Sequence, residues 1–318
     1  TVYSKRRKPE MDKISVIVPC YNEEESLPLY YGETSAVLAS IDGTDHEFIF
    51  VDDGSSDNTL NIIKKLAASD PTVKYVAFSR NFGKEAAMYA GLKESDGDYC
   101  VIMDADLQHP PAMLPKMYNV LKTEKCHCCG GLRLGREGDS RLRSFLSRAF
   151  YKIGKKLTNM DMSDGHGDFR MMNRAVADAI LEMGEYNRYM KGIFSFVGFD
   201  TRWIEYESVD RVRGKSKWNI KSLFSYGFEG ILSFSTAPLK MAGLMGVLLL
   251  GAAAAYLVFN IVQAAAGGTP MNGTEILLFV ILLVSSLQML FIYILGAYLS
   301  RDYLENKRRP IYIVKEKG

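Results

Sequence analysis

The stretch Met241–Ser300 contains one charged residue, Glu275, and this scarcity of charge limits what the chain can become. Two runs within it, Met241–Val262 and Ile276–Leu299, are each long enough to cross the hydrocarbon core of a bilayer, about 30 Å thick, as a helix. A segment rich in glycine separates the two runs. We therefore expect a two-helix transmembrane hairpin over residues 240–300. The alternative is a buried helical hairpin in a soluble core.

Basic residues flank this apolar stretch on both sides. Lys240 precedes it, and Arg301 and Lys307–Arg309 follow it. Because Lys and Arg are enriched in the cytoplasmic flanks of membrane helices, both flanks should face the cytoplasm, together with the large domain that precedes them. We expect a multi-pass protein of the cell (inner or plasma) membrane, with residues 301–318 as a cytoplasmic tail. Residues 219–239 are apolar and aromatic with few charges, which predicts interfacial amphipathic helices.

The chain before residue 219 has a different pattern, in which apolar runs alternate with amphipathic segments. Strand and helix follow each other at short spacing, which is typical of an α/β, doubly wound domain with a mostly parallel sheet. Residues 1–13 are expected to form a flexible basic arm, and no signal peptide is expected. The predicted strands are 14–19, 47–51, 73–78, 99–103, 126–132 and 197–206. The first predicted helix is capped by Asn22 and ends near residue 40, and the second, 59–69, is capped by Ser56 or Asp57. The other predicted helices are 85–93, 141–157 and 173–183.

Carboxylates follow two of these strands at the point where each strand ends. Asp52 and Asp53 follow the second strand, and Asp104 and Asp106 follow the fourth at spacing i and i+2, which places both on one side of an extended chain. Ligands of doubly wound sheets bind outside the carboxyl ends of the strands. Two close carboxylates repel, and a hard divalent cation, Mg²⁺ or Mn²⁺, neutralises them with oxygen ligands. Gln108 continues the spacing as a third ligand; the alternative is a solvated turn.

Two cationic segments could hold phosphate groups. Residues 211–218 carry several Lys and Arg side chains around one glycine and one serine, a composition suited to a diphosphate or a phosphate monoester. The alternative is a positive flank beside a membrane. The basic amphipathic segment 141–157 either contacts phosphates or lipid headgroups, or exposes a solvated cationic face.

The overall charge and the cysteines narrow the class of protein further. A formal net charge of +2 gives no reason to expect a nucleic-acid partner. The five cysteines are odd in number and lie mostly in apolar runs, which favours a reducing compartment over a disulfide scaffold. The spacing in Cys126–Cys129 does not suit a closed zinc site, so we interpret these residues as buried small hydrophobes.

A set of motifs, taken in order, resembles glycosyltransferase family 2. More narrowly, the chain is similar to the polyisoprenyl-phosphate glycosyltransferases, which include bactoprenol glucosyltransferases and dolichol-phosphate mannose synthases. The resemblance covers about Ile14–Trp218. It is carried by Val18–Glu24, Val51–Asp57, Ser79–Lys84 and Asp104–Pro110.

The resemblance implies a GT-A (Rossmann-like) domain over residues 14–218 that binds a nucleotide sugar. It implies inverting, metal-dependent transfer of one sugar, glucose from UDP-glucose in our interpretation, to the phosphate of a membrane polyprenyl phosphate such as undecaprenyl phosphate. A GDP-mannose donor or a modified arabinose donor stays open. Processive synthases of the superfamily carry a Gln-x-x-Arg-Trp segment, and Thr201–Trp203 lacks the Gln, so transfer of a single sugar is favoured. We also expect a homo-oligomer, with a tetramer as one form.

The resemblance also assigns roles by position. Asp168 occupies the place where related inverting enzymes carry their base, but an acceptor phosphate is already ionised near neutral pH, so we expect Asp168 to orient substrate. A catalytically dead binding module would need a broken metal motif, and a transporter subunit would need polar intramembrane residues. The implied residues are Pro19, Tyr21, Glu23, Asp52 and Asp104 for the nucleotide; Asp104, Asp106 and Gln108 for the metal; Arg133, Arg143, Ser147, Arg211, Ser216 and Lys217 for the phosphates and acceptor; and Asp106, Asp168 and Arg211 for catalysis.

Overall fold

The computed structural model describes residues 11–134, 166–207, 237–265 and 273–318. Its contacts divide the chain into two compact units. The first unit comprises Thr1–Phe224 and Pro310–Gly318, and the second comprises Ser225–Arg309. The predicted basic helix 141–157, the cationic loop 211–218 and most of the predicted interfacial segment lie outside the described residues.

The first unit is built on a sheet whose described strands number eight, in the order β7-β5-β6-β4-β1-β2-β3-β8. The pairs β1–β2, β2–β3, β1–β4 and β5–β7 are parallel, so the predicted mostly parallel sheet is confirmed. The strands are β1 (Asp12–Cys20), β2 (Thr44–Asp52), β3 (Val73–Phe78), β4 (Tyr99–Ile102), β5 (Cys128–Leu134), β6 (His166–Asn173), β7 (Thr201–Glu207) and β8 (Val314–Lys317).

The connections make β1 the centre of the sheet. The chain passes from β1 to β2 and β3 on one side, then returns to β4 on the other side of β1. A doubly wound sheet whose strand order reverses in this way binds its ligand at the reversal point. The point lies between β1 and β4, so Cys20 and the residues after Ile102 flank it. The connecting helices are α1 (Leu27–Ala39), α2 (Thr59–Ser69), α3 (Lys84–Glu94), a 3₁₀ turn (Pro111–Met113) with α4 (Leu114–Thr123), α6 (Arg174–Glu182) and α7 (Met190–Val197).

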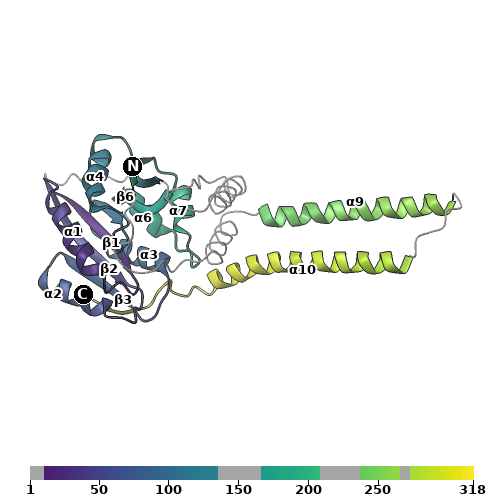
Figure 1. The fold of residues 1–318 in the computed structure, drawn as a ribbon, viewed down its shortest axis with the longest axis horizontal. Coiled ribbons are helices and arrows are strands. Elements are labelled where there is room, and N and C mark those ends of the chain that lie inside the picture. The colour runs from purple at the N-terminus through teal and green to yellow at the C-terminus, as the bar shows by residue number, and fades with distance from the viewer. Residues whose placement is uncertain (1–10, 135–165, 208–236, 266–272) are drawn as a thin grey trace. The chain divides into compact units, whose positions relative to one another are not determined.

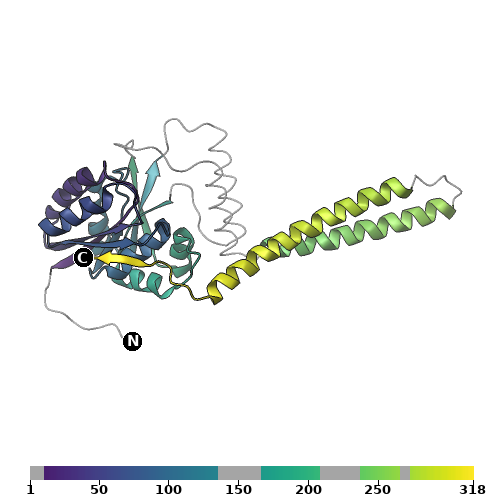
Figure 2. The ribbon, with the colours of Figure 1, turned by 90° about the horizontal axis from the view of Figure 1, so that it is seen from below.

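The two faces of the sheet bury alternate residues of the same strand. On β2, Phe48 and Phe50 pack in the larger apolar core with side chains of α1, α2 and α4, whereas Ile49 and Val51 pack with the alanines of α3. This alternation is the period-two pattern of an extended strand, and it means that both faces are covered. Figures 1 and 2 show helices on both sides of the sheet.

Most local predictions agree with the structure, and the exceptions have local causes. Strand β3 and helix α2 lie at the predicted bounds. The prediction that Asn22 caps the first helix is wrong, because Asn22 adopts a left-handed backbone (φ 54°) in a loop and α1 begins at Leu27. The predicted strand 197–206 begins later, at Thr201, because α7 occupies the preceding residues and Gly198 (φ 69°) ends it. The N-cap of α2 is Asn58 rather than Ser56 or Asp57.

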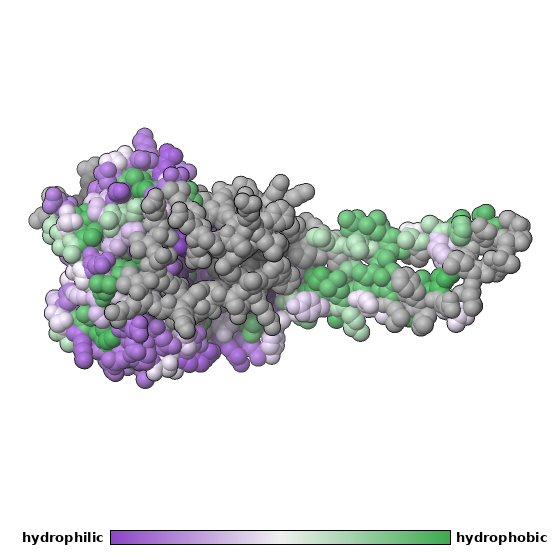
Figure 3. Space-filling model, in the orientation of Figure 1, coloured by the Kyte–Doolittle hydropathy of each residue, from purple (hydrophilic) through white to green (hydrophobic). Residues whose placement is uncertain are grey.

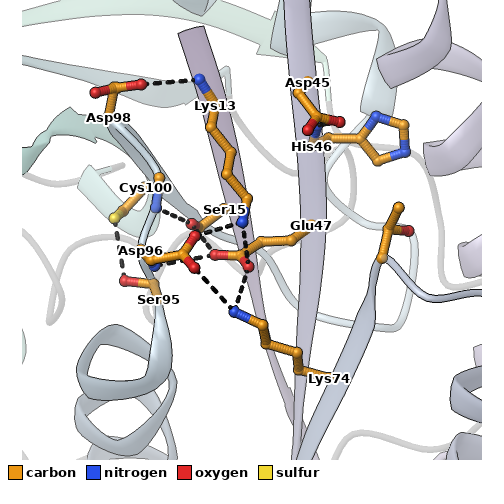
Figure 4. Close-up of polar contacts among 12 residues, drawn as sticks. Lys13, Ser15, Asp45, His46, Glu47, Lys74, Ser95, Asp96, Asp98 and Cys100 are labelled. Carbon is orange, nitrogen blue, oxygen red and sulfur yellow. Dashed lines mark hydrogen bonds and ion pairs between the residues drawn. The ribbon is translucent and has the colours of Figure 1, made fainter. Parts of the chain in front are cut away.

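A polar cluster ties the amino-terminal ends of the central strands together. Glu47, which is 2% exposed, lies 2.9 Å from the Lys13 ammonium and 2.7 Å from the Lys74 ammonium (Figure 4). It also accepts hydrogen bonds from the Ser15 hydroxyl at 2.6 Å and the Asp96 backbone N–H at 3.0 Å. The cluster therefore joins β1, β2, β3 and the turn before β4 at the edge opposite the carboxyl ends.

The second unit consists of two long helices in its described part, α9 (Ala237–Ala265) and α10 (Gly273–Asn306), which contact each other. They cover both predicted apolar runs, so the helical prediction is confirmed there. Among the described residues, Leu283–Asn306 is the stretch long and apolar enough to cross a membrane. Apolar residues are exposed along both helices, including Leu244 and Leu290, and Figure 3 shows this hydrophobic surface. Crossing by both helices stays a prediction.

The sequence predicts that the cysteines are buried small side chains and do not form a disulfide scaffold. All five cysteines are free thiols and buried. Burial raises the pKa of Cys100 and Cys128 above the usual value, so these thiols stay protonated at neutral pH. They behave as small core side chains, as expected from their position in apolar strands.

Candidate active site

The loops after β1 and β2 are joined to each other at the carboxyl edge of the sheet. The Asn22 side chain accepts from the Ser56 N–H at 2.8 Å, and the Asn22 N–H donates to the Ser55 hydroxyl at 2.9 Å. The Glu23 N–H donates to the Thr59 hydroxyl at 2.8 Å. This cross-bonding explains why Asn22 adopts a left-handed backbone, and it fixes the two loops as one wall of the site.

The predicted nucleotide residues gather around this wall. Asp52 ends β2 opposite Cys20, the last residue of β1; Pro19 precedes Cys20, and Tyr21, which is 37% exposed, follows it. Burial raises the pKa of Cys20 well above its usual range, and the carboxylates of Glu23, Asp52 and Asp104 raise it further. The structure therefore brings the predicted nucleotide residues together.

Asp53 holds the loop that follows β3. Its carboxylate accepts from the Phe82 N–H at 2.6 Å and from the Gly83 N–H at 3.0 Å. Gly83 has a positive φ of 98°, a conformation that L side chains rarely adopt. Burial raises the pKa of Asp53 to about 6 despite these hydrogen bonds. The loop is thus fixed at the residue immediately before Lys84, the first residue of α3.

Lys84 joins two carboxylates from different strands. Its ammonium lies 2.6 Å and 2.8 Å from the two oxygens of Asp104 and 3.3 Å from Asp168. All three side chains are part-buried. Burial by itself raises the pKa of a carboxyl, but the Lys84 charge outweighs it, and the pKa values of Asp104 and Asp168 both lie below their usual range. Both groups are therefore ionised at neutral pH.

The sheet register explains why Asp104 and Asp168 meet. Strand β6 runs antiparallel to β4, with Ile102 paired to Arg170 as the last pair at this end. Continuing that register for two residues sets Asp104 opposite Asp168. Asp168 itself lies in strand β6.

His109 connects the Asp104 loop to the same strand. Its ring stacks on Phe169, with centroids 4.7 Å apart and planes at 9°. Burial, followed by the neighbouring Lys84 charge, lowers the pKa of His109, so the ring is neutral at pH 7. The neutral ring leaves Nδ1 as an acceptor for the Asp104 N–H, at 3.3 Å. The stacked ring thus helps to hold the backbone of Asp104.

The side chains predicted to bind a metal, Asp104, Asp106 and Gln108, carry the oxygen ligands that a hard divalent cation prefers. Asp106 accepts from the Gln108 N–H at 3.1 Å, so these two residues share one tight turn. One oxygen of Asp168 is buried and accepts no hydrogen bond from the described residues, and Asp104 already contacts a positive charge. Within the described residues, no three His, Cys, Asp or Glu side chains stand in metal-binding arrangement. Oxygen donors around a bound ammonium are nevertheless the donor set that Mg²⁺ and Mn²⁺ prefer.

The structure does not test every predicted site residue. Arg133 lies on β5, paired with Tyr206 of β7. The predicted phosphate and acceptor residues Arg143, Ser147, Arg211, Ser216 and Lys217 lie outside the described residues, so their roles stay predictions.

Sequence reasoning missed the parts played by Lys84 and His109. Both residues stand inside motifs that carried the family resemblance, but neither was assigned a role. The position of Lys84 could have indicated its role. It directly follows Asn-Phe-Gly and begins a helix that comes after a parallel strand. A side chain at the amino-terminal end of such a helix lies near the carboxyl edge of the sheet, where ligands bind.

The fold and these side chains define a glycosyltransferase of the GT-A type. The chain belongs to glycosyl transferase family 2, whose family model matches residues 15–181. It is 39% identical to the putative glycosyltransferase CsbB of Bacillus subtilis over 95% of this chain and 91% of that protein. It is 38% identical to the prophage bactoprenol glucosyl transferase homolog of Escherichia coli, over 95% of this chain and 98% of that protein.

A solved structure shares the fold. Glucosyl-3-phosphoglycerate synthase of Mycobacterium tuberculosis, crystallised with Mn²⁺, uridine diphosphate and phosphoglyceric acid, matches with a TM-score of 0.50 at 20% identity. The match covers 70% of this chain and 76% of that chain. At this identity the likeness establishes the GT-A fold of the first unit.

Proposed function

We propose that this enzyme transfers one glucose from UDP-glucose to the phosphate of a membrane polyprenyl phosphate, undecaprenyl phosphate, in an inverting reaction that needs Mg²⁺ or Mn²⁺. The observation that carries the proposal is the meeting of Asp104, Asp168 and Lys84 at the reversal point of the sheet. The relatives named as bactoprenol glucosyl transferases, 38% identical over nearly the whole chain, support the lipid acceptor.

The reaction exchanges one bond for another. An oxygen of the acceptor phosphate attacks the anomeric carbon of the sugar, the bond from that carbon to the diphosphate oxygen breaks, and the electron pair leaves with the nucleoside diphosphate. Attack from the face opposite the leaving group inverts the anomeric centre. No proton has to be removed first, because the second pKa of a phosphate monoester is about 6.

The residues divide between the two substrates. Asp104, Asp106 and Gln108 would hold a divalent cation, which when bound neutralises negative charge on the diphosphate as it leaves. Pro19, Tyr21, Glu23 and Asp52 would line the base and ribose pocket, and Arg133, Arg143, Ser147, Arg211, Ser216 and Lys217 would bind the phosphates of donor and acceptor. Arginine suits this task because its planar fork binds phosphate oxygens in pairs.

Asp168 would orient the acceptor side of the site. Its pKa is held below the usual range by Lys84, Lys191 and Arg170 although burial opposes them. A carboxylate that binds a proton so weakly is a poor general base, and its salt bridge with Lys84 fits an orienting role better.

The lipid acceptor requires the enzyme to work at a bilayer. We propose that α9 and α10 both cross the membrane as a hairpin, with the first unit in the cytoplasm where nucleotide sugars are available. The length and exposed apolar side chains of α10, and the basic residues that follow it, support this arrangement.

One assay tests the proposal. The purified full chain in detergent is given undecaprenyl phosphate, Mn²⁺ or Mg²⁺, and a panel of radiolabelled UDP-glucose, GDP-mannose and a modified arabinose donor. We expect labelled lipid from UDP-glucose, and its loss on chelation by EDTA. Asp106→Asn should abolish the product, whereas Asp178→Asn, at a half-exposed carboxylate on α6 that lies 3.8 Å from Arg174, should not. If only GDP-mannose or the arabinose donor gave product, that nucleotide sugar would replace UDP-glucose as the proposed donor. The absence of product from every donor would refute the proposal.

A further inference from the structure

The segment that follows α10 in the chain completes one edge of the catalytic sheet. Strand β8 pairs antiparallel with β3, with Val314 opposite Phe78 and Lys317 opposite Val76. The pairing extends at both ends, because the Ser79 N–H donates to the Ile313 carbonyl at 3.0 Å and the Tyr75 N–H donates to the Gly318 carbonyl at 2.7 Å. A segment distant in sequence therefore lies beside the strand that leads into the Lys84 loop.

Aromatic contacts continue from this segment towards the loop. The Tyr312 ring stacks on Phe78, with centroids 4.8 Å apart and planes at 20°. Phe78 in turn meets Phe82 edge to face, with centroids 5.7 Å apart. Tyr312 and Phe82 both pack against the small apolar cluster that includes Ala86 and Ala87 of the first turns of α3. Tyr312 therefore packs with residues that precede Lys84 in the sequence, Phe78 and Phe82, and in the same cluster as residues that follow it, Ala86 and Ala87.

Contacts on a polar side and on an apolar side hold the loop between β3 and α3. On its polar side, Phe82 and Gly83 donate their backbone N–H groups to Asp53. On its apolar side, Phe82 rests on Phe78, and the Arg80 guanidinium lies over the Phe82 ring at 4.1 Å. Lys84, two residues after Phe82, carries the ammonium that joins Asp104 to Asp168. Only the two peptide units around Gly83 separate the backbone of Phe82 from that of Lys84, so a shift of Phe82 would move Lys84.

We infer that Tyr312 is a positioning residue, which acts through Phe78 and Phe82 to hold Lys84 between the two carboxylates of the site. The inference rests on the proposed function for the identity of the donor, but its structural part does not. It gives the segment after α10 a role in donor use, in addition to covering a sheet edge.

Three variants of the full chain in detergent separate this role from simple edge covering. Tyr312→Ala removes the ring, Tyr312→Phe keeps it, and Lys317→Ala removes the ion pair, 3.3 Å long, between Lys317 of β8 and Glu94 of α3. Amide hydrogen exchange is measured at Phe82 and Gly83, and at Tyr75 at the far end of the β3–β8 pairing. Exchange reports local opening without any ligand.

We expect Tyr312→Ala to speed exchange at Phe82 and Gly83 about tenfold, the size of an aromatic contact, with little change at Tyr75. Tyr312→Phe and Lys317→Ala should match the wild type at the loop. Unchanged exchange at Phe82, or equal acceleration at Tyr75, would overturn the inference, since the ring would then only attach the strand.

A catalytic measurement completes the test. Tyr312→Ala should lower kcat/KM for UDP-glucose about tenfold, and Tyr312→Phe should restore it. If the wild type uses no sugar nucleotide, the proposed function fails while the exchange result still decides the role of Tyr312. If loop exchange rises and kcat/KM does not fall, the positioning role is refuted while the proposed function stands.

Discussion

Replacing Glu47 by glutamine tests whether the polar cluster opposite the active site stabilises the sheet. The change preserves the shape of the side chain and leaves an oxygen to accept from Ser15 and from the Asp96 N–H. It removes the negative charge that faces Lys13 and Lys74, whose nitrogens lie 2.9 Å and 2.7 Å away. The variant therefore loses the charge, and a donating amide NH2 group replaces the oxygen that lies beside both ammonium groups.

The expected magnitude follows from exposure. Removing one partner of a fully buried ion pair costs about 3–5 kcal/mol, whereas an exposed pair contributes about 0–1 kcal/mol. Glu47 is 2% exposed, but the Lys13 and Lys74 side chains are 29% and 40% exposed, so water can solvate both ammonium groups in the variant. We expect Glu47→Gln to lower the free energy of unfolding by about 2 kcal/mol, which corresponds to a Tm lower by about 4–8 °C in a domain of this size.

The effect should depend on pH in a defined direction. Burial raises the pKa of Glu47, but hydrogen bonds and charge from Lys74, Ser15, Asp96 and Lys13 outweigh it, so the pKa lies below the usual value of 4.5. A carboxyl with a lowered pKa stabilises the fold above its unfolded pKa and loses that effect as the pH falls through its folded pKa. The Tm difference between wild type and variant should be constant from about pH 6 to 8 and shrink below about pH 4.5.

Thermal unfolding in detergent, followed by near-ultraviolet circular dichroism, measures the difference. Glu124→Gln is the matched control, because Glu124 makes a 2.9 Å ion pair with Arg202 in which both side chains are largely exposed. It should change the free energy of unfolding by less than about 1 kcal/mol. Equal Tm values for Glu47→Gln and the wild type at pH 7, or a difference that grows on acidification, would refute this reasoning.

Further predictions concern the site. Lys84→Met should tighten Mn²⁺ binding about tenfold in an electron paramagnetic resonance titration without substrate, because the ammonium that competes for Asp104 is removed; unchanged affinity would mean that the two cations do not share the site. Asp168→Asn should slow turnover less than about tenfold, since the acceptor phosphate is already ionised; a complete loss with donor binding intact would show that Asp168 is an essential base. Gly54→Ala should cost about 1–3 kcal/mol by thermal unfolding, because Gly54 has φ 68° and a Cβ there would meet the Arg80 backbone carbon at 2.5 Å; a wild-type Tm would show that the loop yields.

The sequence predicted the part of the fold in which local signals agree with the tertiary structure. The apolar runs that became β1 to β4 are short and alternate with amphipathic segments, so the alternation of strand and helix could be predicted. The carboxylates at Asp52 and Asp104 could be brought to one edge because parallel strands end together. The topology predicted a ligand site at that edge, and the family resemblance implied that the ligand is a nucleotide sugar.

The remainder depends on contacts between residues that are distant in sequence. The pairing of β4 with β6 sets Asp104 opposite Asp168, and no local pattern specifies that register. The ammonium of Lys84 finds its place only once that register exists. Asn22 was misread as an N-cap because its side chain has the right chemistry, but it bonds to Ser56 of another loop instead of its own helix. Strand β8 was missed because Val314–Lys317 is short and highly charged, and only its partner strand makes it extended.

The position of β8 in the chain has a consequence for biosynthesis. This strand leaves the ribosome after α9 and α10, so the nascent catalytic domain carries β3 as an open sheet edge throughout synthesis of both helices. Open edges invite pairing with other polypeptides. The edge of β3 is therefore covered only after β8 itself has been synthesised.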